Sequence, residues 1–155
     1  MLRTTSTTLL LFLTGAGLIA CSHKPIDRPP PETISSAADV AVAQVGRPYR
    51  YGGNSPRGFD CSGLVQYSFA RVGVRLPRST DDQRRIGYAI TSDRIRRGDL
   101  LFFNQEGKRA SHVGIYLGNG EFVHSPSNGK SVHVVRFSDP YWRKHFAGAR
   151  RIDAD

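Results

Sequence analysis

The chain has 155 residues, of which 39% are hydrophobic and 23% are charged, which suits one soluble globular domain and excludes a second of ordinary size. Lys and Arg number 22 against 13 Asp and Glu, giving a formal net charge of +9. This surplus favours an acidic partner, although a generally basic, solvated surface is the alternative. The sequence has no dense basic run and no base-stacking aromatic motif, so nucleic acid is not an expected partner.

Residues 1–20 have the pattern of a secretory signal. Arg3 supplies a positive charge, and the apolar stretch that follows is too short and too interrupted to predict a membrane span. The stretch ends in Leu-Ile-Ala-Cys, which resembles the bacterial lipobox, in which the cysteine carries lipid. Acyl chains on Cys21 would hold the protein at a membrane. Ser22 follows this cysteine in place of Asp, which favours the outer membrane, with the domain facing the periplasm.

Residues 21–34 are expected to form a tether that begins at the lipidated cysteine. Pro25 and the run of three prolines at 29–31 disfavour helix and favour an extended polyproline conformation. An ordinary cleaved signal followed by a chance cysteine is the alternative to the lipobox. The globular domain is then residues 35–155.

Within that domain, helices are expected first and strands second. Residues 35–46, 60–71 and 78–83 carry helix caps or apolar residues at helical spacing. Buried or alternating strands are expected at residues 99–103, 111–117, 121–124, 132–135 and 149–152, with turns at Gly107 and residues 118–120. Helices followed by an antiparallel meander predict an α+β fold and not a βαβ series.

The chain has two cysteines, Cys21 and Cys61. A disulfide between them would suit a secreted protein, but a lipidated Cys21 has no thiol to contribute. Cys61 is then a lone thiol in the first turn of an expected helix, with Asp60 near the N-cap. The free N–H groups and partial positive charge of a helix N-terminus favour a thiolate, so we expect a lowered pKa. The sequence therefore predicts a nucleophile at Cys61.

A thiolate nucleophile needs a base within hydrogen-bond reach and a group that orients the base. His112 alternates with apolar residues, so it is expected on the opposite face of its strand. His124 follows across the hairpin turn, and antiparallel pairing is expected to bring it beside His112 as the orienting group. His133 and His145 are the alternatives for this third position.

Metal binding is the rival use of cysteine and histidine. A zinc site takes three or four protein ligands with short spacing between them. Only Cys61 is left as a thiol ligand, and the sequence contains no His-x-x-x-His pattern. We therefore expect neither a metal nor a cofactor.

Six short motifs, taken together, resemble the NlpC family of papain-like cell-wall peptidases. They lie at residues 49–53 (Tyr-Arg-Tyr-Gly-Gly), 59–65 (Phe-Asp-Cys-Ser-Gly-Leu-Val), 76–80 (Leu-Pro-Arg-Ser-Thr), 97–100 (Arg-Gly-Asp-Leu), 112–116 (His-Val-Gly-Ile-Tyr) and 122–124 (Phe-Val-His). Residues 140–151 are similar to the lipoprotein branch of that family. The resemblance implies a papain-like fold, with N-terminal helices packed on an antiparallel sheet.

The resemblance also implies roles for individual residues. Cys61 would be the nucleophile, His112 the general base and His124 the residue that orients His112. Tyr49 would place its hydroxyl at the oxyanion, with the backbone N–H of Cys61 as the second donor. Four residues would line the substrate cleft: Asp60, Ser62, Arg78 and Ser79. For two of them a structural role is the alternative, a helix cap for Asp60 and a surface ion pair for Arg78.

The substrate and partner that this resemblance implies is peptidoglycan. Family members hydrolyse stem peptides, either between D-glutamate and meso-diaminopimelate or across the D-alanine–diaminopimelate cross-link. Similarity to the lipoprotein branch favours the cross-link. Two other functions stay open, namely a catalytically silent lipoprotein that binds peptidoglycan as a scaffold, and an amidase or transferase that acts outside the wall.

Overall fold

The structure, a computed structural model, describes residues 31–105, 107–127 and 129–152, with side chains from residue 36 onward. The expected signal, Cys21 and most of the expected tether lie outside these residues. Among the helices of the described ranges, none has the length and apolar character that a membrane span requires.

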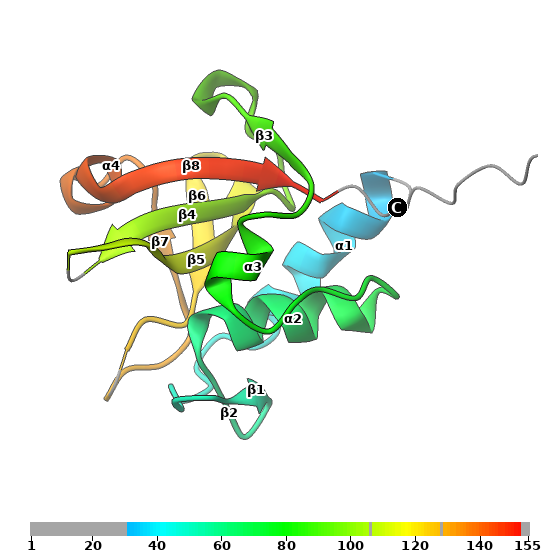
Figure 1. Cartoon of the computed structure of the whole chain (residues 1–155). Coiled ribbons are helices and arrows are strands. Elements are labelled where there is room, and N and C mark those ends of the chain that lie inside the picture. Colours follow the sequence, from blue (N-terminus) through cyan, green and yellow to red (C-terminus); the bar gives the residue numbers. More distant parts are fainter. Residues whose placement is uncertain (1–30, 106, 128, 153–155) are drawn as a thin grey trace, which may run out of the picture.

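Three helices precede the main sheet in the chain. α1 (Pro31–Val42) and α2 (Cys61–Arg71) pack against each other, and the short α3 (Thr80–Gln83) follows α2. A small two-stranded ribbon, β1 (Asn54–Ser55) and β2 (Gly58–Phe59), lies between α1 and α2 in the chain. All three helices lie on one side of the main sheet (Figure 1).

The main sheet has six strands in the order β3-β8-β4-β5-β6-β7, and every neighbouring pair is antiparallel. Its strands are β3 (Tyr88–Ile90), β4 (Leu100–Gln105), β5 (Lys108–Gly118), β6 (Glu121–His124), β7 (His133–Arg136) and β8 (Phe146–Arg151). A 3-10 turn, η1 (Ser92–Arg94), precedes β4, and α4 (Pro140–His145) precedes β8. Helices packed on an antiparallel sheet confirm the predicted α+β fold.

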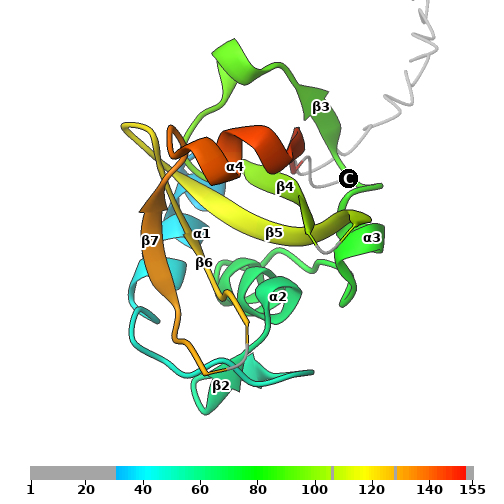
Figure 2. The same ribbon diagram turned by 90° about the vertical axis from the view of Figure 1, so that its left-hand side faces the viewer.

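The core has two parts because both faces of the central strands are covered. Leu100 and Phe102 of β4 pack with the buried residues of α1 and α2. Leu101 and Phe103 point to the other face, where they pack with Trp142 of α4. Successive residues of a strand point to opposite faces, so a strand covered on both sides is a continuous apolar run. In Figure 2, α2 and α4 lie on opposite sides of β5.

Two elements differ most from the sequence prediction, the first helix α1 and the edge strand β3. α1 begins at Pro31 and ends at Val42, four residues before the predicted limits at each end. Polyproline structure was therefore wrong for residues 31–34. Proline fits the first turn of a helix, since it lacks an N–H that the helix would leave unbonded. The sequence also missed β3, a mostly exposed three-residue edge strand with no alternating pattern.

Candidate active site

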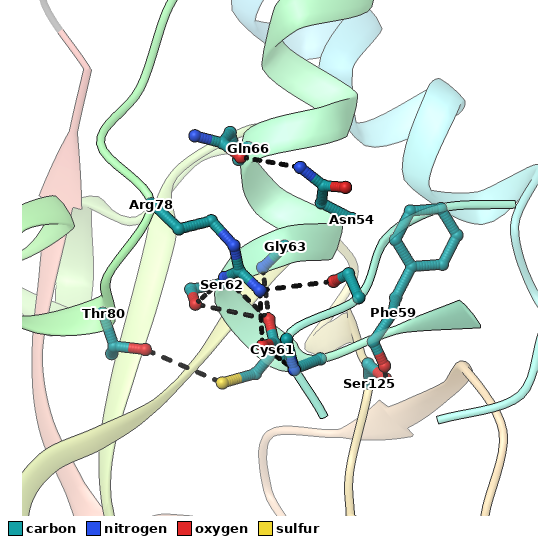
Figure 3. A network of polar contacts seen from close by, with 12 residues as sticks. Asn54, Phe59, Cys61, Ser62, Gly63, Gln66, Arg78, Thr80 and Ser125 are labelled. Carbon is teal, nitrogen blue, oxygen red and sulfur yellow. Dashed lines mark hydrogen bonds and ion pairs between the residues drawn. The ribbon is translucent and has the colours of Figure 1, made fainter. Parts of the chain in front are cut away.

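Cys61 is the first residue of α2, as the sequence predicted, and Asp60 is the N-cap. The Asp60 carboxylate accepts a hydrogen bond from the Gly63 N–H at 2.7 Å. The thiol is free and partly exposed, and its sulfur lies 3.7 Å from the Thr80 hydroxyl (Figure 3). The backbone N–H groups of Ser62 and Val113 also act on the sulfur. Since Val113 directly follows His112 in β5, the thiol lies beside the part of the sheet that carries the predicted base.

The pKa of Cys61 is raised, which is opposite to the prediction. Burial of the sulfur is the largest cause, and the negative charge of Asp60 raises the pKa further. The hydrogen bond with Thr80 and the N–H groups of Val113 and Ser62 lower the pKa, but by less than burial raises it. The sequence therefore located the start of α2 correctly but overestimated how far a helix N-terminus lowers the pKa of Cys61. Desolvation disfavours the charged thiolate and outweighs that effect. In the free protein the thiol stays protonated at neutral pH and needs a base to take its proton.

Asp60, Ser62 and Arg78 form one polar network beside the thiol. The Arg78 guanidinium donates to both carboxylate oxygens of Asp60, at 2.9 Å through Nη1 and 2.6 Å through Nη2. The same Nη1 donates to the Ser62 hydroxyl at 2.8 Å (Figure 3). The cap and the ion pair, the structural alternatives for Asp60 and Arg78, are thus both present. The role of these residues in substrate binding stays a prediction.

Ser79 does not join this network. Its hydroxyl accepts from the Asp82 N–H at 3.1 Å and donates to the Asp82 carboxylate at 2.6 Å, so it caps α3. That cap starts the helix whose first residue, Thr80, contacts the thiol. Gln83, at the end of α3, is fully buried and donates to the Ser62 carbonyl at 3.0 Å. Sequence reasoning missed both roles, although Thr80 belongs to the motif at residues 76–80.

The glycine of the motif after the nucleophile has a packing reason. A Cβ at Gly63 would lie 2.0 Å from the Gly53 carbonyl oxygen, so no larger side chain fits there. The Asp60 N–H donates to that same carbonyl at 3.0 Å. The motifs at residues 49–53 and 59–65 are therefore two halves of one tightly packed turn around the start of α2.

His112 and His124 lie side by side on β5 and β6, as predicted. His112 Nε2 is 2.8 Å from His124 Nδ1, and the two side chains are 2% and 1% exposed. Trp142 stacks on His112, with ring centroids 5.7 Å apart and planes inclined by 25°. The sequence placed His112 opposite the apolar face of its strand but did not identify Trp142 as its cover. The indole and the two imidazoles form one buried aromatic group.

Both histidines are neutral at neutral pH. Burial lowers the pKa of His112 to about 4. It lowers that of His124 to about 2, with smaller contributions from the positive charges of His112, His133 and Lys130. A neutral His112 can accept a proton. Because its Nε2 is held by His124, the nitrogen left to accept is Nδ1, which has no hydrogen-bond partner in the part of the chain that the structure describes.

The thiol and His112 are neighbours without a direct hydrogen bond between them. Among the described side chains, the hydrogen-bond partner of the sulfur is Thr80. Catalytic contacts are often long in a free enzyme and tighten when substrate binds. The free structure therefore holds His112, the predicted base, near a thiol with which it does not form a hydrogen bond.

Tyr49 lies next to the segment that leads to Cys61. Its N–H donates to the Lys130 carbonyl at 2.8 Å, and it forms a parallel bridge with Phe59. Its hydroxyl as an oxyanion donor stays a prediction. The buried Ser125 hydroxyl, which the sequence did not single out, donates to the Phe59 carbonyl at 2.7 Å. This bond ties the residue after His124 to the approach to Cys61.

The other histidines lie apart from the base. His133 packs against His124 with ring centroids 4.7 Å apart, and its Nδ1 is 2.8 Å from the Ser131 carbonyl oxygen. His145 Nδ1 is 2.7 Å from the Tyr141 carbonyl oxygen within α4. Within residues 36–152 as described, no group of three His, Cys, Asp or Glu side chains is arranged to hold a metal ion. Of the three candidates, His124 is the one within hydrogen-bond distance of His112, and its role as the orienting residue stays a prediction.

Known proteins match this chain closely. The NlpC/P60 family matches residues 46–151. The murein DD-endopeptidase MepH of Escherichia coli (strain K12) is 40% identical over 147 residues, which cover 89% of this chain but only 52% of that protein. The probable endopeptidase NlpC of the same strain is 39% identical over 153 residues, 92% of this chain and 97% of that protein. The crystal structure of an NlpC/P60 family protein from Bacillus cereus ATCC 10987 superposes with a TM-score of 0.72 at 32% identity, covering 81% of this chain and 41% of that one.

Proposed function

Because the chain belongs to the NlpC/P60 family, we propose that it is a peptidoglycan endopeptidase that hydrolyses a stem-peptide amide bond through Cys61. The observation that carries this proposal is the placement of the helix-end thiol against the strand that carries the paired histidines. The Cys61 thiol, at the N-terminus of α2, lies beside Val113 of β5. The residue before Val113 is His112, a buried and neutral imidazole that contacts the His124 ring. This arrangement suits a nucleophile that is deprotonated by a base as it attacks.

In the proposed mechanism, His112 Nδ1 takes the thiol proton while the sulfur attacks the carbonyl carbon of the substrate. The oxyanion is stabilised by the Cys61 N–H and the Tyr49 hydroxyl. The tetrahedral intermediate collapses, and the amine leaves with the proton from His112, which gives a thioester. His112 then takes a proton from a water molecule that attacks the thioester, the carbon–sulfur bond breaks, the carboxylic acid product leaves, and His112 returns the proton to the Cys61 sulfur. His124 keeps His112 in the required tautomer and orientation throughout.

For the bond that is cut, we propose the D-alanine–diaminopimelate cross-link. Support comes from the name of MepH, a murein DD-endopeptidase, and from the similarity to the lipoprotein branch. The basic balance of the chain fits a polymer rich in carboxylates. Cleavage between D-glutamate and diaminopimelate is the other outcome that analysis of the products distinguishes.

For the location, we propose a lipid anchor on Cys21 after removal of residues 1–20, at the outer membrane and facing the periplasm. Support comes from the lipobox-like Leu-Ile-Ala-Cys and from Ser22 after it. The proline-containing segment that follows would give the domain reach toward the wall. Metabolic labelling with a radioactive fatty acid tests this, with Cys21→Ala expected to abolish the label.

The activity is tested by digesting purified sacculi and identifying the new peptide termini by mass spectrometry. Cys61→Ala is expected to abolish release of muropeptides, by at least about 10³-fold, because it removes the nucleophile. Its melting temperature should stay close to that of the wild type. Equal release by the variant would refute the proposal. Binding to sacculi without any release by the wild-type protein would support the scaffold alternative.

A further inference from the structure

A cavity of about 190 Å³ lies between the end of α3 and the β3–β8 edge of the main sheet. Three arginines from separate segments line it, namely Arg84 after α3, Arg109 of β5 and Arg150 of β8. No carboxylate lines the cavity in the part of the chain that the structure describes. Because an arginine side chain stays charged at any ordinary pH, the cavity is strongly basic and suits a negatively charged group.

Small residues leave room between these arginines. Ala147 and Gly148 of β8 also line the cavity, and a Cβ at Gly148 would meet no atom within 4 Å. Ala147 and Arg109 are exposed, so the cavity opens to solvent. Pockets that hold a whole small molecule usually exceed about 300 Å³, so this smaller cavity fits one end of a longer ligand.

Two of the three guanidinium groups are free to bind such a ligand. Arg84 donates to the Asp81 carboxylate at 3.0 Å. Among the described residues, the side chains of Arg109 and Arg150 form no hydrogen bond or ion pair. A guanidinium presents several N–H donors in one plane and can bind a carboxylate or a phosphate through two of them. An anion in the cavity would therefore gain charged hydrogen bonds without breaking existing ones.

The cavity lies on the same face of the sheet as the Cys61 thiol. Phe102, which lines the cavity, belongs to the helix-side core, and Cys61 packs against that same core. Thr80, at the start of α3, contacts the sulfur, and Arg84 directly follows the end of this four-residue helix. Figure 1 shows α3 between α2 and the β3–β8 edge of the sheet. A ligand could thus extend from the thiol along α3 to the arginines.

Strand β5 indicates which part of a substrate would reach the cavity. In the proposed mechanism His112 protonates the leaving amine, so this amine lies within hydrogen-bond reach of β5. Arg109 precedes His112 by three residues on the same strand, which is about 10 Å along it. An extended peptide covers about 3.5 Å per residue, and the diaminopimelate side chain adds to that reach. A carboxylate about two residues beyond the cut bond can therefore meet the arginines.

We propose that this arginine cavity binds the C-terminal carboxylate of the fragment that leaves during cleavage. The proposal rests on the proposed peptidoglycan endopeptidase function and names a part of the substrate that lies beyond the cut bond. For both stem-peptide bonds considered above, the leaving amine belongs to diaminopimelate, and the leaving fragment keeps the C-terminal carboxylate of its peptide. Binding at the cavity would hold this amine near His112, and no covalent step is involved.

A comparison of two substrates in two proteins tests the proposal. One soluble cross-linked muropeptide has a free C-terminal carboxylate on the leaving fragment, and the other has an amide there. For the wild type, amidation should lower kcat/KM about ten-fold, the lower range for a lost hydrogen bond to a charged group. The double variant Arg109→Gln/Arg150→Gln should lose about as much on the free carboxylate. Amidation should then cost it less than about two-fold more, because both changes remove the same interaction.

The double variant Arg136→Gln/Arg143→Gln is the matched control. It removes the same charge from two exposed arginines, one on β7 and one on α4, that do not line the cavity. It should keep the full effect of amidation, and both double variants should keep the melting temperature of the wild type. A full effect of amidation in the cavity variant would overturn the carboxylate site, as would equal cleavage of both substrates by the wild type.

Binding to phosphatidylglycerol vesicles separates a membrane lipid from the substrate as the source of the anion. The two double variants lose the same charge, so they should bind these vesicles equally. Weaker binding by the cavity variant alone, with an unchanged effect of amidation, would overturn the proposal in favour of a lipid phosphate. These results leave the endopeptidase proposal intact as long as cleavage requires Cys61. Cleavage by Cys61→Ala would refute the endopeptidase itself.

Discussion

The two halves of the candidate site, one around Cys61 and one around His112, are stabilised by different kinds of contact. Around Cys61 the contacts are polar and ionic, with the Asp60–Arg78 pair and the helix cap at the protein surface. Around His112 the contacts are aromatic and dry, with Trp142 stacked over the ring. The first half places the sulfur by directed hydrogen bonds, and the second half keeps the base neutral by excluding water. A cysteine–histidine pair thus needs one region for position and another for protonation.

The aromatic half should be the more sensitive to truncation. Trp142 is 9% exposed and contacts both histidines, so Trp142→Ala is expected to lower the free energy of unfolding by about 3–5 kcal/mol. Activity should fall as well, because water would reach His112. Urea denaturation measures the first effect. The neighbouring Tyr141→Ala is the control, since Tyr141 is 47% exposed. Equal destabilisation by both changes would contradict the packing argument.

Acid should weaken the same half selectively. The pKa of His112 is lowered to about 4 and that of His124 to about 2, whereas both lie near 6.5 in an unfolded chain. Below pH 6.5 these two histidines are protonated in the unfolded chain but stay neutral in the folded protein. Stability is therefore complete above about pH 6.5 and falls toward pH 4, by up to about 1.4 kcal/mol per pH unit for each histidine.

Chemical denaturation between pH 4 and 7 measures this slope. His124→Gln should reduce the slope by about the share of one histidine, since Gln has no titrating group. An unchanged slope in that variant would show that His124 titrates normally in the folded protein.

In the polar half, removal of one charge should cost less. Arg78→Gln leaves the Asp60 carboxylate, which is 16% exposed, without its ion pair. We expect a loss of about 1–2 kcal/mol, at the lower end for such pairs because the Arg78 side chain is 37% exposed. Arg85→Gln, in an exposed pair with Asp81, is the control and should leave the melting temperature unchanged. A larger loss than that of Trp142→Ala would reverse the comparison between the two halves.

The smallest effect is expected at Thr80, whose hydroxyl lowers the pKa of Cys61. Thr80→Val removes the 3.7 Å contact with the sulfur, so iodoacetamide should label Cys61 a few-fold more slowly at neutral pH. Thr91→Val, in an exposed residue whose side chain caps nothing, should not change the rate. Faster labelling of Thr80→Val would mean that the hydroxyl hinders the sulfur more than it stabilises the thiolate.

Much of the candidate site could be predicted from the sequence because it depends on residues that are close together along the chain. The cap residue before Cys61 predicted the start of α2. Alternation along β5 and a short glycine-rich turn predicted that the side chains of His112 and His124 lie close together. These features involve neighbours along the chain or across one hairpin, and backbone geometry alone determines them. The early start of α1 was missed because the proline run before it was interpreted as extended polyproline structure, and the edge strand β3 was missed because it has no alternating pattern.

The sequence by itself identified Cys61, His112 and His124 as the candidate nucleophile, base and orienting residue, and it placed them on a helix end and two adjacent strands. Only the tertiary structure decided their protonation, since the raised pKa of Cys61 and the lowered pKa of His112 both come from burial. Desolvation depends on every group that covers a site, including Trp142, which lies 30 residues after His112 in the chain. Such cover has no spacing rule, so it appears only when the chain is folded.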